Sequence, residues 1–357
     1  MRIVYAADYS FKRCGQYYYD TVLKFQQGLI TSGHYVYPFS LGDMERLFSP
    51  LGHRSFGQKG LNRALLKTCR NIEPDILFLS HGTRIYPETL AAIRADVPGI
   101  KVIFFWNDPI WEKPRIEAIQ MKLAHLDGVF MTTGGDWLLP FAGEGRVVAY
   151  VPCPAEPTID DGRAFESAQT DYDLVFFGND EPRRNEILKT IKSQLPGVRI
   201  GFFGCLGSPN VFGIQKSKIT ARSKMALNLS RRNDVQLYSS NRMSDTTANG
   251  VLNFCDAASG LQSLYRENEV VYYRDMDDLI TKVRHYFEQD DERIAIARAG
   301  WRRAHEDLSA QRIAQFMVHA TLRTPGYTEI PWPKFIIEDG RKVCWPIPAA
   351  SGFATGS

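Results

Sequence analysis

The stretch that decides the fold class is DILFLSHGTRIYPETLAAIRADVPGIKVIFFW, residues 75–106. Its two ends, 75–80 and 101–106, are apolar runs that are typical of buried strands, and 88–95 between them is predicted to be a helix. An apolar strand, a helix and a second apolar strand in succession form a parallel βαβ unit, whose sheet is covered on both faces. The stretch therefore predicts an α/β protein built on a parallel sheet.

The same alternation extends to both sides of this unit. In the helix expected before it, Val22, Phe25 and Leu29 recur at helical spacing, and Gly33 follows as a C-cap. Further strands are expected at 2–7, 34–39 and 128–132, and further helices at 18–32, 60–71 and 115–126.

The pattern breaks once and then restarts. Residues 151–157, VPCPAEP, are rich in proline, and 158–170 are polar with few apolar residues, so the domain boundary is predicted there. Beyond it, strands are expected at 173–177, 198–203, 225–229 and 270–273, and helices at 183–194, 244–250, 276–289, 291–307 and 310–323.

Two similar α/β units are therefore expected, spanning 1–155 and 171–308, with their parallel sheets facing a cleft. Ligands of such sheets bind outside the carboxyl ends of the strands, so the functional site is expected in the cleft. The C-terminal helix and tail, 309–357, are expected to pack back on the first unit, and the last residues, 352–357, to be disordered.

Composition and charge exclude several classes of protein. The 357 residues are 44% hydrophobic and 23% charged, which excludes a disordered or fibrous chain. A net charge of +3 does not predict a nucleic-acid-binding protein held by phosphate contacts, although it leaves room for a local basic site. Six cysteines without a C-x-x-C pair predict reduced thiols rather than disulfides or zinc ligands.

Two observations bear on location. The sequence contains no apolar run of the roughly 18 residues that a membrane span needs. Its N-terminus, MRIVYAADYS, lacks the basic and apolar regions of a signal peptide and instead resembles a first strand. We therefore expect a cytoplasmic protein, with at most a peripheral contact to the inner face of a membrane.

The most informative stretch of the second unit is 241–250, NRMSDTTANG. A loop here leads into a helix whose first turn is expected to hold Ser244 and Asp245, and helix N-termini bind anions. Arg242 can add a fork of donors for a phosphate, and Asp245 can accept from ribose hydroxyls. The alternative is that Ser244 or Asp245 only caps the helix and Arg242 is a surface residue.

A second anion-binding candidate follows the first strand of the second unit. There Gly178 leads through a short turn to Arg183 and Arg184 at the start of a helix, where a phosphate would meet backbone amides. Neither the G-x-G-x-x-G nor the P-loop fingerprint is present. The alternative is a polar turn followed by two solvated arginines.

Several segments of the second half resemble, in the same order, the CgeB-like bacterial glycosyltransferases, which are related to glycosyltransferase family 4. The resemblance begins near Phe176 and ends near Arg312. The resembling segments are FFGNDEPRRNEIL (176–188), FFG (202–204), MALNLSRRND (225–234), NRMSDTTANG (241–250), SGLQSLYRENEVVYYRDMDDLITKV (259–283) and DERIAIARAGWRRAHEDLSAQR (291–312).

The resemblance implies specific residue roles. Arg242, Asp245, Ala248 and Gly250 stand where the family's Arg-x-x-acid-x-x-Ala-x-Gly helix start contacts the nucleotide sugar, the acid reaching the ribose. The sequence departs from the pattern in three ways. Asp replaces the commoner Glu, the upstream glutamate of many family 4 enzymes falls at Leu237, and their Gly-Gly-x-x-Glu loop is reduced to Ser-Gly-Leu-Gln at 259–262.

The resemblance also implies a fold and a reaction. The fold is GT-B, with two Rossmann-like domains, the second binding the nucleotide-sugar donor and the first the acceptor. No metal or other cofactor is expected, because a helix dipole and basic side chains neutralise the leaving diphosphate. Retention of the anomeric configuration is implied by kinship.

The first unit offers two candidates for acceptor chemistry. His81 and Asp108 follow the apolar strands 75–80 and 101–106, so both are expected at the carboxyl edge of the sheet, where catalytic groups gather. Either could orient or deprotonate an acceptor hydroxyl. The alternative is that Asp108 caps a turn and His81 is a structural histidine.

The leading hypothesis is therefore an enzyme that transfers a sugar from a nucleotide-sugar donor to a hydroxyl of a glycan, glycolipid or glycoprotein. Two alternatives stay open: a nucleotide-sugar epimerase or hydrolase of the same fold, and a non-catalytic nucleotide-sugar binding protein.

Overall fold

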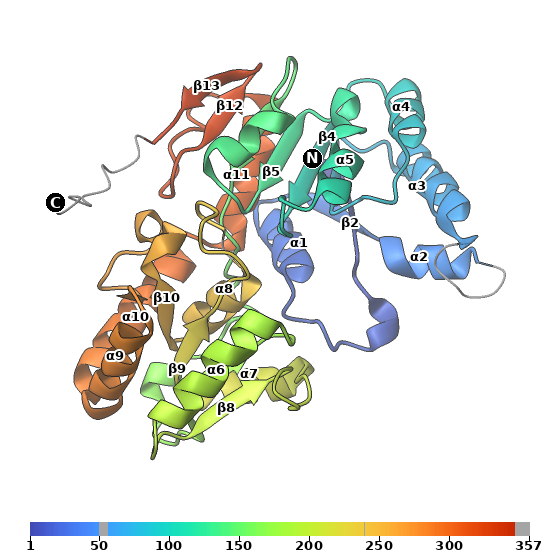
Figure 1. The fold of residues 1–357 in the computed structure, drawn as a ribbon. Helices are drawn as coiled ribbons and strands as arrows, with labels where there is room; N and C mark the ends of the chain where they lie inside the picture. The colour runs from blue at the N-terminus through green and yellow to red at the C-terminus, as the bar shows by residue number, and fades with distance from the viewer. Residues whose placement is uncertain (50–55, 239, 347–357) are drawn as a thin grey trace.

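The computed structural model describes residues 1–49, 56–238 and 240–346. It contains two sheets that lie in separate halves of the molecule, one above the other in Figure 1, with helices packed against each. All pairings among β1–β6 and among β7–β11 are parallel, which confirms the predicted α/β class.

The first sheet has the strand order β13-β12-β6-β5-β4-β3-β1-β2. Its central strands β3 and β4 are buried except for Lys101 at the start of β4, as their apolar sequences predict. The strand β6 was not predicted from the sequence. The bounds of the parallel strands are β1 (Arg2–Ala7), β2 (Tyr35–Ser40), β3 (Ile76–Ser80), β4 (Lys101–Trp106), β5 (Gly128–Met131) and β6 (Val147–Tyr150).

The helices of the first half connect these strands. The short helix α2 was not predicted, and the helix expected at 115–126 ends earlier, at Gln120, with a 3₁₀ turn after it. The helices are α1 (Thr21–Thr31), α2 (Leu41–Leu47), α3 (Gln58–Ile72), α4 (Pro87–Asp96) and α5 (Lys113–Gln120), and the 3₁₀ segments are η1 (Phe11–Arg13), η3 (Leu123–His125) and η4 (Gly135–Phe141).

The second sheet has the order β11-β10-β9-β7-β8. The strand β10 and the helix α7 were not predicted, and α8 begins at Asn241 rather than near Ser244. The strands are β7 (Tyr172–Phe177), β8 (Ile200–Phe203), β9 (Ser223–Asn228), β10 (Leu252–Asp256) and β11 (Val271–Tyr273); the helices are α6 (Pro182–Gln194), α7 (Gly213–Ala221), α8 (Asn241–Ala248), α9 (Met276–Glu288) and α10 (Asp290–Glu306).

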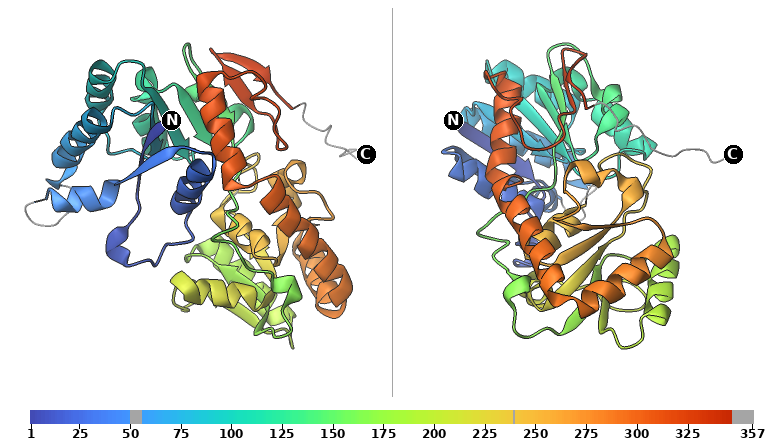
Figure 2. Two further views of the ribbon diagram at one scale, coloured as in Figure 1. Left: turned by 180° about the vertical axis from the view of Figure 1, so that it is seen from behind. Right: turned by 90° about the vertical axis from the view of Figure 1, so that its left-hand side faces the viewer.

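The end of the chain returns to the first half of the molecule. Helix α11 (Ala310–Leu322) lies beside α1 (Figure 2), and the approach is close: a Cβ added at Gly28 would lie 2.5 Å from the carbonyl carbon of Ala310. The tail then forms β12 (Ile336–Glu338), which pairs antiparallel with β6, and β13 (Arg341–Cys344). The tail therefore extends the first sheet. The expectation for 352–357 falls outside the described residues.

Candidate functional site

A cleft lies between the two halves of the molecule. It consists of two adjoining cavities, of about 770 and 440 Å³. Both are lined by Tyr17, Asp20, Asn107 and Asp108 from the first half and by Asn241 from the second. Because the shared lining residues come from both halves, the two cavities form one continuous cleft at the carboxyl ends of the strands, where parallel sheets bind ligands.

The larger cavity brings together His81 and Asp108. Their strands, β3 and β4, are neighbours in the sheet, so both side chains emerge at its carboxyl edge. His81 Nε2 lies 3.8 Å from Asp108 Oδ2, and the imidazole packs on the Trp106 ring with centroids 4.7 Å apart. Arg115 from α5 forms an ion pair with the same Asp108 oxygen at 2.8 Å. The arrangement can bind and polarise a hydroxyl group.

The protonation of His81 is set by its surroundings. Burial lowers the pKa of the imidazole below its ordinary value, while the Asp108 carboxylate opposes this shift. The ring is therefore neutral at pH 7 and can accept a hydrogen bond or a proton from a hydroxyl. The backbone of His81 has a φ of 66°, a left-handed conformation that is uncommon outside glycine and recurs at functional sites.

The second half contributes a pair of arginines. Arg184 and Arg242 lie over the Phe176 ring, at 5.3 and 4.6 Å from its centroid, and each donates to the Leu229 carbonyl at 3.1 Å. Arg242 also donates to the Phe177 carbonyl. Burial lowers the pKa of both guanidinium groups. The Arg184 charge lowers the pKa of Arg242 further, while Glu181 opposes the shift of Arg184.

The positive charges of these two arginines are not balanced by a carboxylate in direct contact among the described residues. Within the described part of the chain, neither forms an ion pair with a carboxylate, although like charges held together in a partly buried position cost free energy. A bound anion would offset that cost, and a diphosphate offers oxygens to both forks. Arg242 lines the smaller cavity of the cleft, and Arg184 lines a neighbouring pocket of about 130 Å³.

The N-terminus of α6 is not arranged as expected. The carboxylate of Glu181 caps this helix and accepts from the backbone amides of Arg183 and Arg184, so the amides expected to meet a phosphate are already occupied. The Arg183 side chain lines the small pocket beside Arg184. Gly178 lines the cleft, and its missing side chain leaves space that Phe176 and Arg242 fill, since an added Cβ would lie 2.7 Å from the Phe176 ring.

The N-terminus of α8 does open on the cleft. Ser240 and Asn241 line the smaller cavity, and Ser240 makes no side-chain cap, so the first amides and the positive end of the helix dipole face the cavity. Because the helix begins at Asn241, Arg242 lies in its first turn rather than before it. Ser244 lies one turn further in and donates to the Pro154 carbonyl at 2.7 Å, so the expectation that it binds phosphate is not supported.

Gly250 also has a packing role. It follows the C-terminal end of α8 with a φ of 78°, and an added Cβ would lie 2.7 Å from the Phe165 ring and 2.9 Å from the Ala164 nitrogen. It does not line the described cleft cavities.

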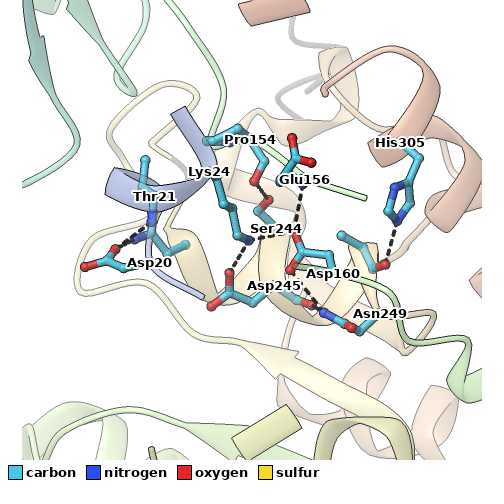
Figure 3. Close-up of polar contacts among 12 residues, drawn as sticks. Asp20, Thr21, Lys24, Pro154, Glu156, Asp160, Ser244, Asp245, Asn249 and His305 are labelled. Carbon is cyan, nitrogen blue, oxygen red and sulfur yellow. Dashed lines mark hydrogen bonds and ion pairs between the residues drawn. The ribbon is translucent and has the colours of Figure 1, made fainter. Parts of the chain in front are cut away.

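Asp245 is held in a buried charge network (Figure 3). Its Oδ1 pairs with Lys24 of α1 at 2.8 Å, and Lys24 also pairs with Asp160 at 2.8 Å. Its Oδ2 pairs with Lys216 of α7 at 2.7 Å. Burial opposes ionisation of Asp245, but Lys216 and Lys24 hold its pKa below the ordinary value. Both oxygens of Asp245 are thus engaged, so a ribose hydroxyl would have to share them.

Sequence reasoning missed three members of this neighbourhood. Lys24 lies on the buried face of a helix, Lys216 is on a helix that was not predicted, and Asp20 precedes α1 as its N-cap. The capping position of Asp20 was a readable signal. The contacts that Lys24 and Asp20 make with the second half could not be predicted from the neighbouring sequence, because their partners are 221 positions away.

The residues at 1–49, 56–238 and 240–346 form neither a metal-binding cluster nor a membrane-spanning helix. In those ranges, no group of three or more His, Cys, Asp or Glu side chains is placed to hold a metal ion. Among the described helices, none is long and apolar enough to cross a bilayer.

The fold is shared with glycosyltransferases of the GT-B class. HepE from Anabaena, in complex with UDP-glucose, aligns over 90% of this chain and 100% of its own, with a TM-score of 0.61 and 11% identity. The sucrose-phosphate synthase of Thermosynechococcus elongatus aligns over 90% and 98%, with a TM-score of 0.58 and 11% identity. AviGT4, a glycosyltransferase involved in avilamycin A biosynthesis, aligns over 90% and 97%, with a TM-score of 0.56 and 14% identity. These similarities confirm the predicted GT-B fold.

A comparison with protein-family models points to the same class of enzyme. Residues 183–319 match a family model described as glycosyl transferase-like. This segment of the chain is therefore similar to glycosyltransferases, and the chain as a whole has the predicted GT-B fold. No curated protein matches the sequence significantly.

Proposed function

We propose that this protein is a glycosyltransferase that moves a sugar from a nucleotide-sugar donor to an acceptor hydroxyl. The observation that carries the proposal is the Arg184–Arg242 pair beside the cleft, two cations that share one carbonyl and lack a carboxylate partner among the described residues. The N-terminus of α8 opens on the same cavity, so the leaving diphosphate would meet both a helix dipole and a guanidinium.

The other predicted residues take roles around this anchor. Arg183 would reach the donor from the neighbouring pocket, and Asp245 would face the ribose while held by its two lysines. In the first domain, His81 and Asp108 would bind the acceptor hydroxyl. Neutralisation of the diphosphate by side chains and a helix dipole supports transfer without a metal ion.

The resemblance to CgeB-like enzymes supplies the finer part of the proposal. It suggests retention of the anomeric configuration, and an acceptor that is a glycan, glycolipid or glycoprotein. A cytoplasmic location, with peripheral contact to a membrane when the acceptor is lipid-linked, belongs to the same proposal.

One observation favours a second candidate, a non-catalytic nucleotide-sugar binding protein. Leu237 stands where many family 4 enzymes have a glutamate, and its side chain is fully buried, so no acidic group reaches the donor from this position. A nucleotide-sugar hydrolase or epimerase would use the same donor anchor.

A thermal-shift panel of UDP-, GDP-, TDP- and CMP-sugars tests the proposal. We expect one nucleotide series to raise Tm, and slow release of sugar from that donor when no acceptor is present. Stabilisation without any release of sugar would favour the binding protein, and no stabilisation by any member would overturn the proposal.

A further inference from the structure

Asp20 occupies the junction of the two cavities of the cleft. It precedes α1 in the first domain and lines both cavities, as does Asn241 at the start of α8 in the second domain. Asp20 Oδ1 accepts from the backbone amide of Thr21 at 2.7 Å and from Asn241 Nδ2 at 3.3 Å. One carboxylate oxygen thus caps a helix and ties the two domains together.

The other oxygen has no such partner. Among the residues that the structure describes, none donates a hydrogen bond to Asp20 Oδ2 or forms an ion pair with it. Burial is the main cause that raises the pKa of the Asp20 carboxyl above its ordinary value; Asp245 raises it further, whereas the Thr21 amide and Lys216 lower it. An acceptor oxygen in a partly buried position is costly to leave without a donor, so a ligand hydroxyl would be favoured there.

In a nucleotide sugar the sugar follows the diphosphate, and this order indicates which ligand hydroxyl would meet Asp20 Oδ2. With the diphosphate at Arg242 and the N-terminus of α8, and the acceptor beside His81 and Asp108, the transferred sugar must lie between these two groups. Asp20 lines the cavities on both sides of that position. Sugar hydroxyls donate short, charge-assisted hydrogen bonds to carboxylates.

We propose that Asp20 Oδ2 accepts a hydrogen bond from a hydroxyl of the transferred sugar, so that the first domain takes part in recognising the donor sugar. This assignment rests on the proposed function and extends it. It gives the sugar an acidic contact from the domain opposite to the one that binds the diphosphate, and Asn241 couples that contact to α8.

Two other roles for Asp20 make different predictions. A purely structural residue would support the domain arrangement, so its loss would weaken the binding of every nucleotide. A general base for the acceptor would matter for turnover but not for donor affinity. Recognition of the sugar alone predicts a loss that is confined to nucleotide sugars.

The test uses Asp20→Asn, because asparagine keeps an oxygen for the Thr21 amide and is itself a good N-cap. The affinities of UDP, GDP and TDP, and of their glucose, galactose and mannose esters, are measured calorimetrically for the parent and the variant. The matched control is Asp96→Asn. Asp96 is the last residue of α4, pairs with Arg70 and lines neither cavity.

We expect Asp20→Asn to bind the bare diphosphate like the parent and the preferred nucleotide sugar about tenfold or more weakly, the loss of one hydrogen bond to a charged group. Equal binding of both ligands by variant and parent overturns the assignment, even if turnover falls. A parallel loss of both ligands also overturns it. If the parent binds no nucleotide, the proposed function itself fails, which distinguishes that failure from the others.

Discussion

At the scale of single residues, the arginine pair is the least ordinary feature of the second domain. Arg184 and Arg242 donate hydrogen bonds to the same Leu229 carbonyl and stack on the same Phe176 ring. These contacts fix both guanidinium groups without neutralising either charge. Fixed cations lose little conformational entropy when an anion binds, which is why we propose this pair as the phosphate site.

Replacing Arg242 by alanine is therefore expected to weaken donor binding by about 1.5–3 kcal/mol, the worth of a hydrogen bond to a charged group. Calorimetric titration with the stabilising nucleotide sugar measures the change. Arg302→Ala, which removes an exposed arginine of α10, serves as the control. If Arg242→Ala binds donor like the parent, the diphosphate site is misplaced.

The His81–Asp108 pair makes a prediction about protonation. Burial lowers the pKa of His81 and Asp108 is the strongest influence that raises it, so removing the Asp108 charge leaves only the weaker effects of Asp20 and Asn107 against burial and Arg115. Asp108→Asn should therefore move the titration of His81 to a still lower pH. An NMR pH titration of the His81 ring resonance measures it, and a pKa that stays or rises in Asp108→Asn would show that the two side chains do not interact.

A site residue could be predicted from the sequence only where its immediate sequence neighbours reveal its position in the fold. His81 and Asp108 each follow an apolar strand, and Arg242 opens a helix, so their places could be read from neighbouring residues. The pairing of Lys24 with Asp245 could not, because 221 positions separate them and a lone lysine on an apolar helix face carries no local mark.

At the scale of secondary-structure elements, Lys24 links α1 of the first domain to α8 of the second. It is 1% exposed and pairs with Asp160 and Asp245, both nearly buried. Removing one member of such a network leaves buried charges unpaired. The contact therefore stabilises one arrangement of the two domains.

Lys24→Met should lower the free energy of unfolding by about 3–5 kcal/mol. Lys189→Met, which breaks an exposed pair with Glu186, should cost at most about 1 kcal/mol. Urea denaturation measures both. Equal effects of the two substitutions would contradict the buried-network account.

The same network has a pH dependence with a defined sign. Burial would lower the pKa of Lys24, but Asp160 and Asp245 raise it above the ordinary value. A raised pKa in the folded state stabilises the fold at pH values below the unfolded pKa of about 10.4, and that stability is lost as the pH rises through the folded pKa. Lys24→Met should lack this alkaline loss, which unfolding curves recorded at several pH values would reveal.

Prediction of the elements succeeded where the interior of a strand is apolar and failed where polar residues are buried. The β3 and β4 strands are apolar except for Ser80 and Lys101 at their ends, and both were identified from the sequence. In β10, the buried Asn253 interrupts the apolar pattern, and it is tolerated because it bonds to Thr246 and Thr247 on α8. Those partners exist only in the folded chain.

The tail hairpin makes a further prediction at this scale. The strand β12 covers the edge of β6, and Trp332, Phe335 and Ile336 are buried beside it. Truncation after Thr324 should expose an apolar edge strand, lower Tm and promote aggregation. Size-exclusion chromatography and a thermal melt check this, and a truncated chain that stays monodisperse with the parent's Tm would show that the tail is dispensable.

At the scale of the whole molecule, Arg242 and the N-terminus of α8 line one part of the cleft, and His81 and Asp108 of the first half line the other. The Asp20–Asn241 and Lys24–Asp245 contacts join the two halves. A donor held by its diphosphate at one side would present its sugar to an acceptor at the other, which is the arrangement that group transfer needs.

The most direct test of this account is a crystal structure of the protein with the nucleoside diphosphate that stabilises it most. The account predicts that the diphosphate contacts the Arg242 guanidinium and the first amides of α8, inside the smaller cavity of the cleft. A diphosphate bound elsewhere, with the Arg184–Arg242 pair unoccupied, would contradict it.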